Sequence, residues 1–186
     1  TTRLVGSEMC IRDRNLITTF KPISMGLSQS RTYLFGAIFI LGNLLLPQLC
    51  HFIPDGGKMW LPIYFFTLIA AYKFGLRVGL LTAIFSPVLN CLLFGMPSLA
   101  ILPVLLIKSS LLAGVAAGVA HYTQKLSLLH IAVVIVAYQV FGGMAEWLLT
   151  GSFMVAVQDF TWGLPGMLFQ IIGGWLALKG LAKYEF

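Results

Sequence analysis

The sequence predicts an all-α integral membrane protein, folded as a bundle of six transmembrane helices. Of its 186 residues, 59% are hydrophobic and only 10% are charged, and the mean hydropathy is +0.92. A soluble domain of this length cannot bury so much apolar surface. The apolar residues form long runs and lack the period-two alternation of a membrane β-barrel. We therefore predict a single helical membrane domain.

Each predicted helix is an apolar run bounded by turn-forming residues such as those at 54–57 and 95–98. About 20 helical residues cross the hydrocarbon core, and shorter helices fit inside a bundle. The second run is the short one, and we expect residues 151–162 to form the longest loop. The predicted helices are 32–52, 59–74, 76–95, 100–121, 127–150 and 161–182.

The distribution of basic residues predicts the orientation. If the N-terminus is inside, only Lys58 falls in an outer loop, whereas six basic residues lie at inner helix ends. This asymmetry follows the positive-inside rule, so we predict both termini in the cytoplasm. The inner set is Arg31, Lys73, Arg77, Lys125, Lys179 and Lys183.

The first residues do not resemble the rest of the chain. Residues 4–14 have the sequence LVGSEMCIRDR, which is similar to a translated sequencing-adapter fragment and has no signal-peptide core. We expect residues 1–24 to be a non-native or disordered extension and the true start to be Met25. Residues 25–186 then form the membrane domain.

One lysine lies inside an apolar run. Lys108 is in the fourth predicted helix, and Glu146 is the single acid inside any other run. Charged groups in hydrocarbon are costly and usually functional. Five helices place a polar group in the outer half of the bundle, which predicts a pocket open to the outside. The candidate substrate-binding residues are Lys108, Glu146, Asn90, Tyr64, Gln170 and Trp147.

Most of these candidates have a structural alternative. Lys108 either contacts an anionic group of the ligand, forms an internal ion pair with Glu146 or contacts helix carbonyls. Asn90 and Gln170 could form hydrogen bonds between helices, and Trp147 could be an interfacial anchor.

Small residues form further helix faces. Gly114 and Gly118 form a GxxxG step that we expect to pack within the bundle, with partner docking as the second interpretation. Two longer stripes are Gly163, Gly166, Gly173 and Ala177 on the last helix, and Gln139, Gly142, Gly143, Glu146 and Thr150 on the fifth.

Several functions have no support in the sequence. The chain has no GxxxxGK[ST], HExxH or GxSxG motif, and its Cys and His residues lack metal-ligand spacing. We therefore predict no enzymatic activity, no metal and no cofactor. The net charge of +6 does not indicate nucleic-acid binding, because the basic residues mostly flank apolar runs.

The middle of the chain resembles a transporter family. The run from Leu61-Pro62 through Gly75, Gly79 and Pro87 to Gly95-Met96-Pro97 is similar to the second and third helices of the substrate-binding S components of ECF-type (energy-coupling factor) vitamin transporters. Gly163-Leu164-Pro165-Gly166, followed by Gln170, resembles the start of that family's last helix. The resemblance covers about residues 59–183.

This resemblance implies capture of a vitamin or related small metabolite from the outer side of a bacterial or archaeal cytoplasmic membrane. It also implies partners: an energising transmembrane subunit and two ATPase subunits. Docking would use helices 1 to 3, where the first offers only Gly36, Ala37 and Gly42 as small residues. The alternative is a MreD-like structural membrane subunit of the cell-shape machinery, which would explain the size and topology but not the polar outer half.

Overall fold

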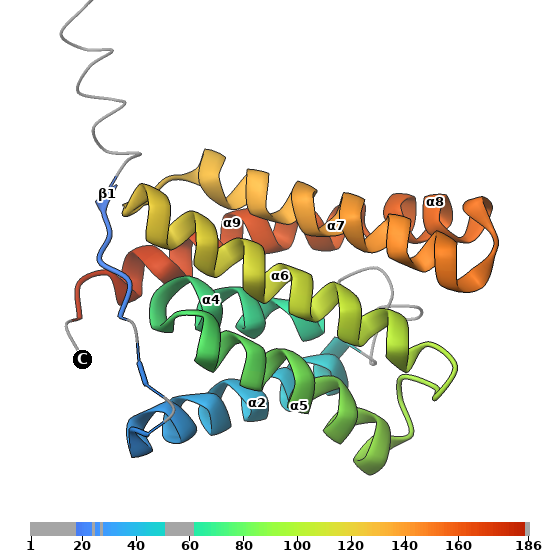
Figure 1. Ribbon diagram of the computed structural model, residues 1–186, viewed down its shortest axis with the longest axis horizontal. Helices are drawn as coiled ribbons and strands as arrows, with labels where there is room; N and C mark the ends of the chain where they lie inside the picture. The colour runs from blue at the N-terminus through green and yellow to red at the C-terminus, as the bar shows by residue number, and fades with distance from the viewer. Residues whose placement is uncertain (1–17, 24, 27, 51–61, 185–186) are drawn as a thin grey trace, which may run out of the picture.

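The computed structural model describes residues 18–23, 25–26, 28–50 and 62–184, which form a bundle of roughly parallel and antiparallel helices (Figure 1). The chain direction reverses from α2 to the short α4, and again from α4 to α5, from α5 to α6 and from α6 to α7. The helices are α2 (Ser30–Cys50), η1 (Pro62–Tyr64), α4 (Phe65–Phe74), α5 (Leu76–Phe94), α6 (Leu102–Thr123), α7 (Leu128–Thr150), α8 (Phe153–Trp162) and α9 (Leu164–Leu181). Two short strands, β1 (Thr18–Thr19) and β2 (Lys125–Leu126), pair antiparallel.

The all-helical membrane class agrees with the structure, but the number of full spans does not. Within the described residues, five helices are long and apolar enough to cross a membrane: α2, α5, α6, α7 and α9. The second predicted helix is present as Pro62–Phe74, which is below that length. Its 13 residues extend about 20 Å at 1.5 Å per residue, whereas the hydrocarbon core is about 30 Å thick.

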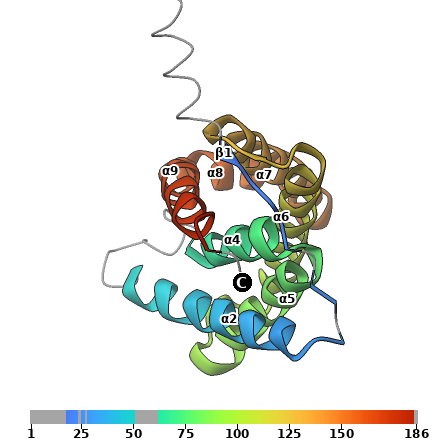
Figure 2. The ribbon, with the colours of Figure 1, turned by 90° about the vertical axis from the view of Figure 1, so that its left-hand side faces the viewer.

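The short helix α4 lies at the centre of the bundle. Seen end-on, it is surrounded by the other helices (Figure 2), and it packs against α2, α5, α6 and α9. Residues 67–74 are each at most 4% exposed. Because its neighbours rather than lipid cover it, α4 can be shorter than the bilayer is thick.

A glycine allows α4 and α5 to turn tightly back on each other. Gly75 joins them with a φ of 86°, in the region that favours glycine. One turn later, a Cβ on Gly79 would lie 2.5 Å from Cβ of Ala71 and 2.8 Å from its Cα. The two helices therefore approach closely at a point where no larger residue fits.

A cluster of buried polar side chains links α2 to α4 and α5 through hydrogen bonds. Asn43 donates from Nδ2 to Thr67 Oγ1 at 3.0 Å and to Ser86 Oγ at 3.1 Å. Its Oδ1 accepts from the backbone N–H of Phe66, in the first turn of α4, at 3.3 Å. Asn90 donates to the carbonyl of Asn43 at 3.1 Å. In an apolar bundle these bonds satisfy groups that lipid could not.

The two small-residue faces have different roles. On α9, a Cβ on Gly173 would lie 3.1 Å from the Phe65 ring, so this face packs inside the bundle. On α6, a Cβ on Gly114 or Gly118 would meet nothing within 4 Å among the described residues. The expectation that the Gly114–Gly118 step packs within the bundle is therefore wrong.

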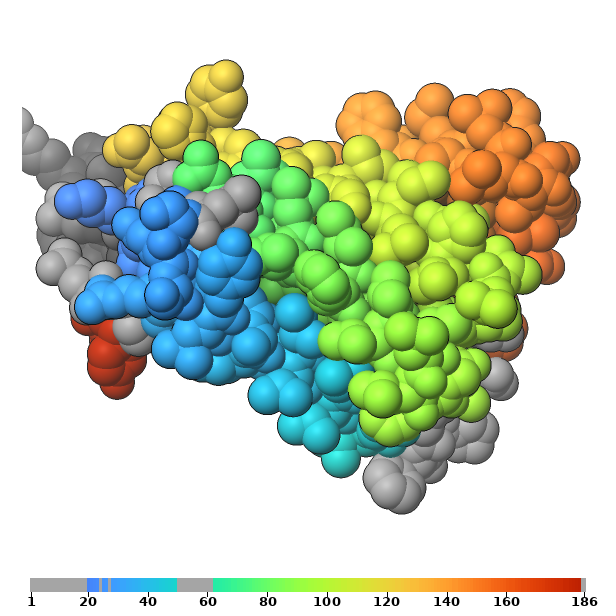
Figure 3. Space-filling model, turned by 60° about the horizontal axis from the view of Figure 1, so that its bottom comes forward, coloured from blue at the N-terminus to red at the C-terminus, as the bar shows by residue number. Residues whose placement is uncertain are grey.

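The small residues of α2 also mostly face inward. A Cβ on Gly42 would lie 2.9 Å from the Phe66 ring, and buried Gly36 lies nearest to Leu81. A docking role does not fit these two glycines, because helices of the same chain cover them. Ala37 is exposed, on an outer face of α2 that runs along the surface beside α5 (Figure 3). That face carries Tyr33, Leu34, Ile38, Leu41, Leu45 and Leu49.

Part of the predicted N-terminal extension is packed. Phe20 is 1% exposed, lies 5.3 Å from the Tyr72 ring and donates its N–H to the carbonyl of Gln124 at 2.9 Å. Ile23 donates to the carbonyl of Lys73 at 2.7 Å. The prediction that nothing before Met25 packs is therefore wrong for residues 18–23. Residues 4–14, which resemble an adapter, lie outside the described residues.

Two N-terminal truncations test whether the packing of Phe20 stabilises the fold. We expect deletion of residues 1–17 to leave the melting temperature unchanged, and deletion of residues 1–24 to lower it by several degrees. Burial of one Phe side chain stabilises a fold by about 1.5–3 kcal/mol, and the longer deletion also removes the β1–β2 pairing. Equal melting temperatures for the two truncated proteins in detergent would contradict the packing role of Phe20.

The basic residues collect at one end of the bundle. Arg31 starts α2, Lys73 ends α4, Arg77 starts α5, Lys125 follows α6 and Lys179 ends α9, all at the left in Figure 1. The cytoplasmic assignment of this end remains a prediction from the positive-inside rule. Lys58, which we assigned to an outer loop, lies outside the described residues.

Cysteine labelling tests the orientation. In a background with Cys10, Cys50 and Cys91 replaced by Ser, Met154→Cys in α8 should react with an impermeant maleimide from outside. Tyr122→Cys should react only after the cells are opened. Both side chains are exposed, 64% for Met154 and 90% for Tyr122. The reverse pattern would contradict the predicted orientation.

Candidate functional site

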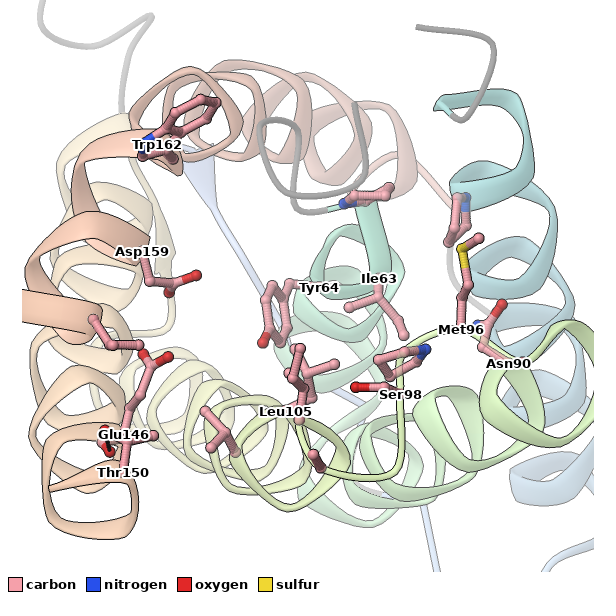
Figure 4. A pocket seen from close by; sticks show the side chains of 18 of the residues that line it. Ile63, Tyr64, Asn90, Met96, Ser98, Leu105, Glu146, Thr150, Asp159 and Trp162 are labelled. Atoms are coloured by element: carbon pink, nitrogen blue, oxygen red, sulfur yellow. Dashed lines mark hydrogen bonds between the residues drawn. The ribbon is translucent and has the colours of Figure 1, made fainter. Parts of the chain in front are cut away.

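A cavity of about 920 Å³ opens at the end of the bundle opposite the basic residues. It exists because α4 begins partway along its neighbours, so α5, α6 and α7 continue beyond it. The residues of η1 form one wall, and α8 lies across from them (Figure 4). A cavity is thus present near several of the predicted polar residues, and its location on the outer side remains a prediction from the positive-inside rule. Its apolar lining includes Pro47, Pro62, Ile63, Met96, Ile101, Val104, Leu105, Val155 and Trp162.

Lys108 forms two ion pairs beside this cavity. Its side chain is 3% exposed, and Nζ lies 2.6 Å from Glu146 Oε2 and in contact with Asp159 Oδ2. The predicted meeting of Lys108 and Glu146 is therefore confirmed, in the form of the internal ion pair. Glu146 and Asp159 line the cavity, and Lys108 is absent from the described residues that do so.

Gly142 provides the space for this lysine. A Cβ on Gly142 would lie 2.6 Å from Lys108 Cγ, so the aliphatic part of the lysine crosses α7 where the helix has no side chain. One turn later on the same face, Glu146 meets the ammonium. Gly142 and Glu146, two members of the predicted stripe on α7, are thus the part of it that receives Lys108.

Asp159 is the member of the cluster that the sequence did not identify. We predicted residues 151–162 to be a loop, and the structure shows α8 over most of them. α8 turns Asp159 inward, where Oδ2 also accepts from Gln139 Nε2 at 3.4 Å. A signal was available: a buried lysine needs a carboxylate, and the sequence holds only six acids.

Tyr64 places an unsatisfied hydroxyl at the cavity. The residue is 1% exposed, yet its hydroxyl has no hydrogen-bond partner among the described residues. Its ring packs 5.4 Å from Tyr138. In Figure 4, Tyr64 lies between the carboxylates of Glu146 and Asp159 on one side and Asn90 and Met96 on the other. Buried polar groups are almost always bonded, so this hydroxyl is suited to meet a bound molecule.

The other three candidates have mainly structural contacts. Asn90 lines the cavity, but its Nδ2 is engaged with the carbonyls of Asn43 and Ser86. Gln170 is fully buried and accepts from the Tyr138 hydroxyl at 3.1 Å, away from the cavity lining. Trp147 is 45% exposed and packs edge-on against Phe153. Among the described residues, the tryptophan that lines the cavity is Trp162, not Trp147.

Within the described residues, no cluster of His, Cys, Asp and Glu could hold a metal ion. Comparison of the chain with protein-family models, with curated proteins and with solved structures finds no significant match. The function is therefore argued from the geometry of the cavity.

Proposed function

We propose that this chain is the substrate-capture membrane subunit of an ECF-type importer in a bacterial or archaeal cytoplasmic membrane. The observation that carries the proposal is the cavity of about 920 Å³, with buried charges and an unsatisfied tyrosine hydroxyl at its wall. Its volume lies within the range of sites that enclose a small organic molecule, and its lining is mainly apolar with a few polar groups.

The position of the cavity supports uptake. It opens at the end away from the basic residues, which is the outer side if the positive-inside rule holds. The sequence contains no Walker A motif, so ATP hydrolysis would be the work of separate ATPase subunits joined through an energising transmembrane subunit. A structural subunit of the MreD type has no need of such a cavity.

The proposal has a direct test. The chain purified in mild detergent should carry a small metabolite in native mass spectrometry. In vesicles it should bind this metabolite but accumulate it only when the energising subunits and ATP are added. An empty protein, or accumulation driven by an ion gradient without those subunits, would contradict the proposal.

A further inference from the structure

The cavity presents carboxylates rather than an ammonium to a solute. Lys108 Nζ is held between Glu146 Oε2 and Asp159 Oδ2 and is absent from the described cavity wall. The second oxygens of the two carboxylates, Oε1 and Oδ1, accept no hydrogen bond from the part of the chain that the structure describes. Both carboxylates line the cavity. A bound molecule therefore meets acceptor oxygens with negative charge.

The charges of the cluster do not balance. One ammonium faces two carboxylates, so the three ionised side chains together carry a net charge of about −1. Glu146 is 10% exposed and Asp159 is 32% exposed at the side chain. A charge held in surroundings of low polarity is costly unless it is compensated. A cation entering the cavity would provide that compensation.

We propose that the ligand is an organic cation, such as an amine, an amidine or a protonated nitrogen heterocycle, whose nitrogen binds between Glu146 and Asp159. This assignment rests on the proposed capture function and narrows its substrate class. The Tyr64 hydroxyl, buried and unsatisfied at the same wall, accepts a further N–H of the ligand or donates to it. The face of a tyrosine or tryptophan ring also attracts a cation, and Trp162 adds a second ring to the lining.

The apolar wall defines the rest of the molecule. Ile63, Val104 and Leu105 line the cavity beyond Tyr64, so the body of the ligand is uncharged and apolar or aromatic. Lys108 is then a positioning residue. It holds two like-charged carboxylates side by side and removes part of their mutual repulsion, without touching the ligand.

Three nearly isosteric probes test the charge preference: benzamidine, benzamide and benzoate, which are cationic, neutral and anionic. We expect the chain in nanodiscs to bind benzamidine at least about 10-fold more tightly than benzamide, and benzoate most weakly, by calorimetry or by shift of the melting temperature. Benzoate binding more tightly than benzamidine, equal affinities, or no measurable binding of any probe would overturn the assignment.

One variant and its control test whether Asp159 is responsible for the preference for a cation. Asp159→Asn keeps the ion pair between Lys108 and Glu146, so the protein should still fold, and it should lose at least about 10-fold in benzamidine affinity with little change for benzamide. The control is Thr161→Ala, an exposed position of α8 outside the described cavity wall, which should change neither affinity. If Asp159→Asn folds and retains the preference for benzamidine, the assignment is wrong.

The outcomes separate this inference from the proposed function. A co-purified anionic or neutral metabolite, imported with ATP, would support capture and overturn the cationic class. Preferential benzamidine binding without ATP-dependent uptake of any co-purified cation would support the cation site and contradict the importer.

Discussion

Replacing Lys108 by Met is expected to lower the free energy of unfolding by about 3–5 kcal/mol, the usual cost of removing one partner from a buried ion pair. The change leaves the carboxylates of Glu146 and Asp159 next to each other without the ammonium that now contacts both. Thermal melting in detergent, together with a reversible SDS titration, measures the loss.

The double variant Lys108→Met/Glu146→Gln is the control for this effect. It removes the ammonium and the more buried carboxylate together and leaves Asp159, whose side chain is 32% exposed. We expect it to recover most of the stability. A single Lys108→Met protein as stable as the wild type would contradict the ion-pair cluster, and a double variant no more stable than the single one would show that lysine packing dominates.

The second large effect is expected from Gly142→Ala. The added methyl would lie 2.6 Å from Lys108 Cγ, close to the backbone end of the lysine, where the side chain has little freedom to move aside. Forcing an extra group into a packed interior costs about 1–3 kcal/mol. The ammonium should also move away from the carboxylates, so the affinity for benzamidine should change along with stability.

The neighbouring glycine provides the matched control. A Cβ on Gly143 would meet nothing within 4 Å among the described residues. Gly143→Ala should be neutral or stabilising by up to about 1 kcal/mol, because alanine favours the helix. Equal melting temperatures for the two variants would contradict the close approach of Lys108 to Gly142.

The sequence predicted the helices well because lipid imposes one strong requirement, a long apolar run. Thus α5 was predicted at 76–95 and is observed at Leu76–Phe94, and α7 was predicted at 127–150 and is observed at Leu128–Thr150. The requirement for a long apolar run was least informative for segments that do not span the membrane. α8 has only 10 residues, so its apolar sequence FMVAVQDFTW does not form a run of membrane length, and residues 151–162 were assigned to a loop.

The site was predictable only in part, for the same reason. The cost of burying Lys108 indicated that it would meet Glu146, and it does. The third member, Asp159, lies on α8, and its inward direction depends on how that helix packs against α7. Asn43 was missed because it stands within an apolar run, although its side chain joins three helices.

The central position of α4 has a consequence for permeation. The cavity ends at η1, and beyond it residues 67–74 fill the axis of the bundle with buried side chains, among them Leu68, Tyr72 and Phe74. These residues act as a plug about 12 Å long at the helical rise of 1.5 Å per residue. Among the described residues, a solute in the cavity therefore meets packed side chains along the axis of the bundle. Passage along this axis would require the helices around α4 to move apart.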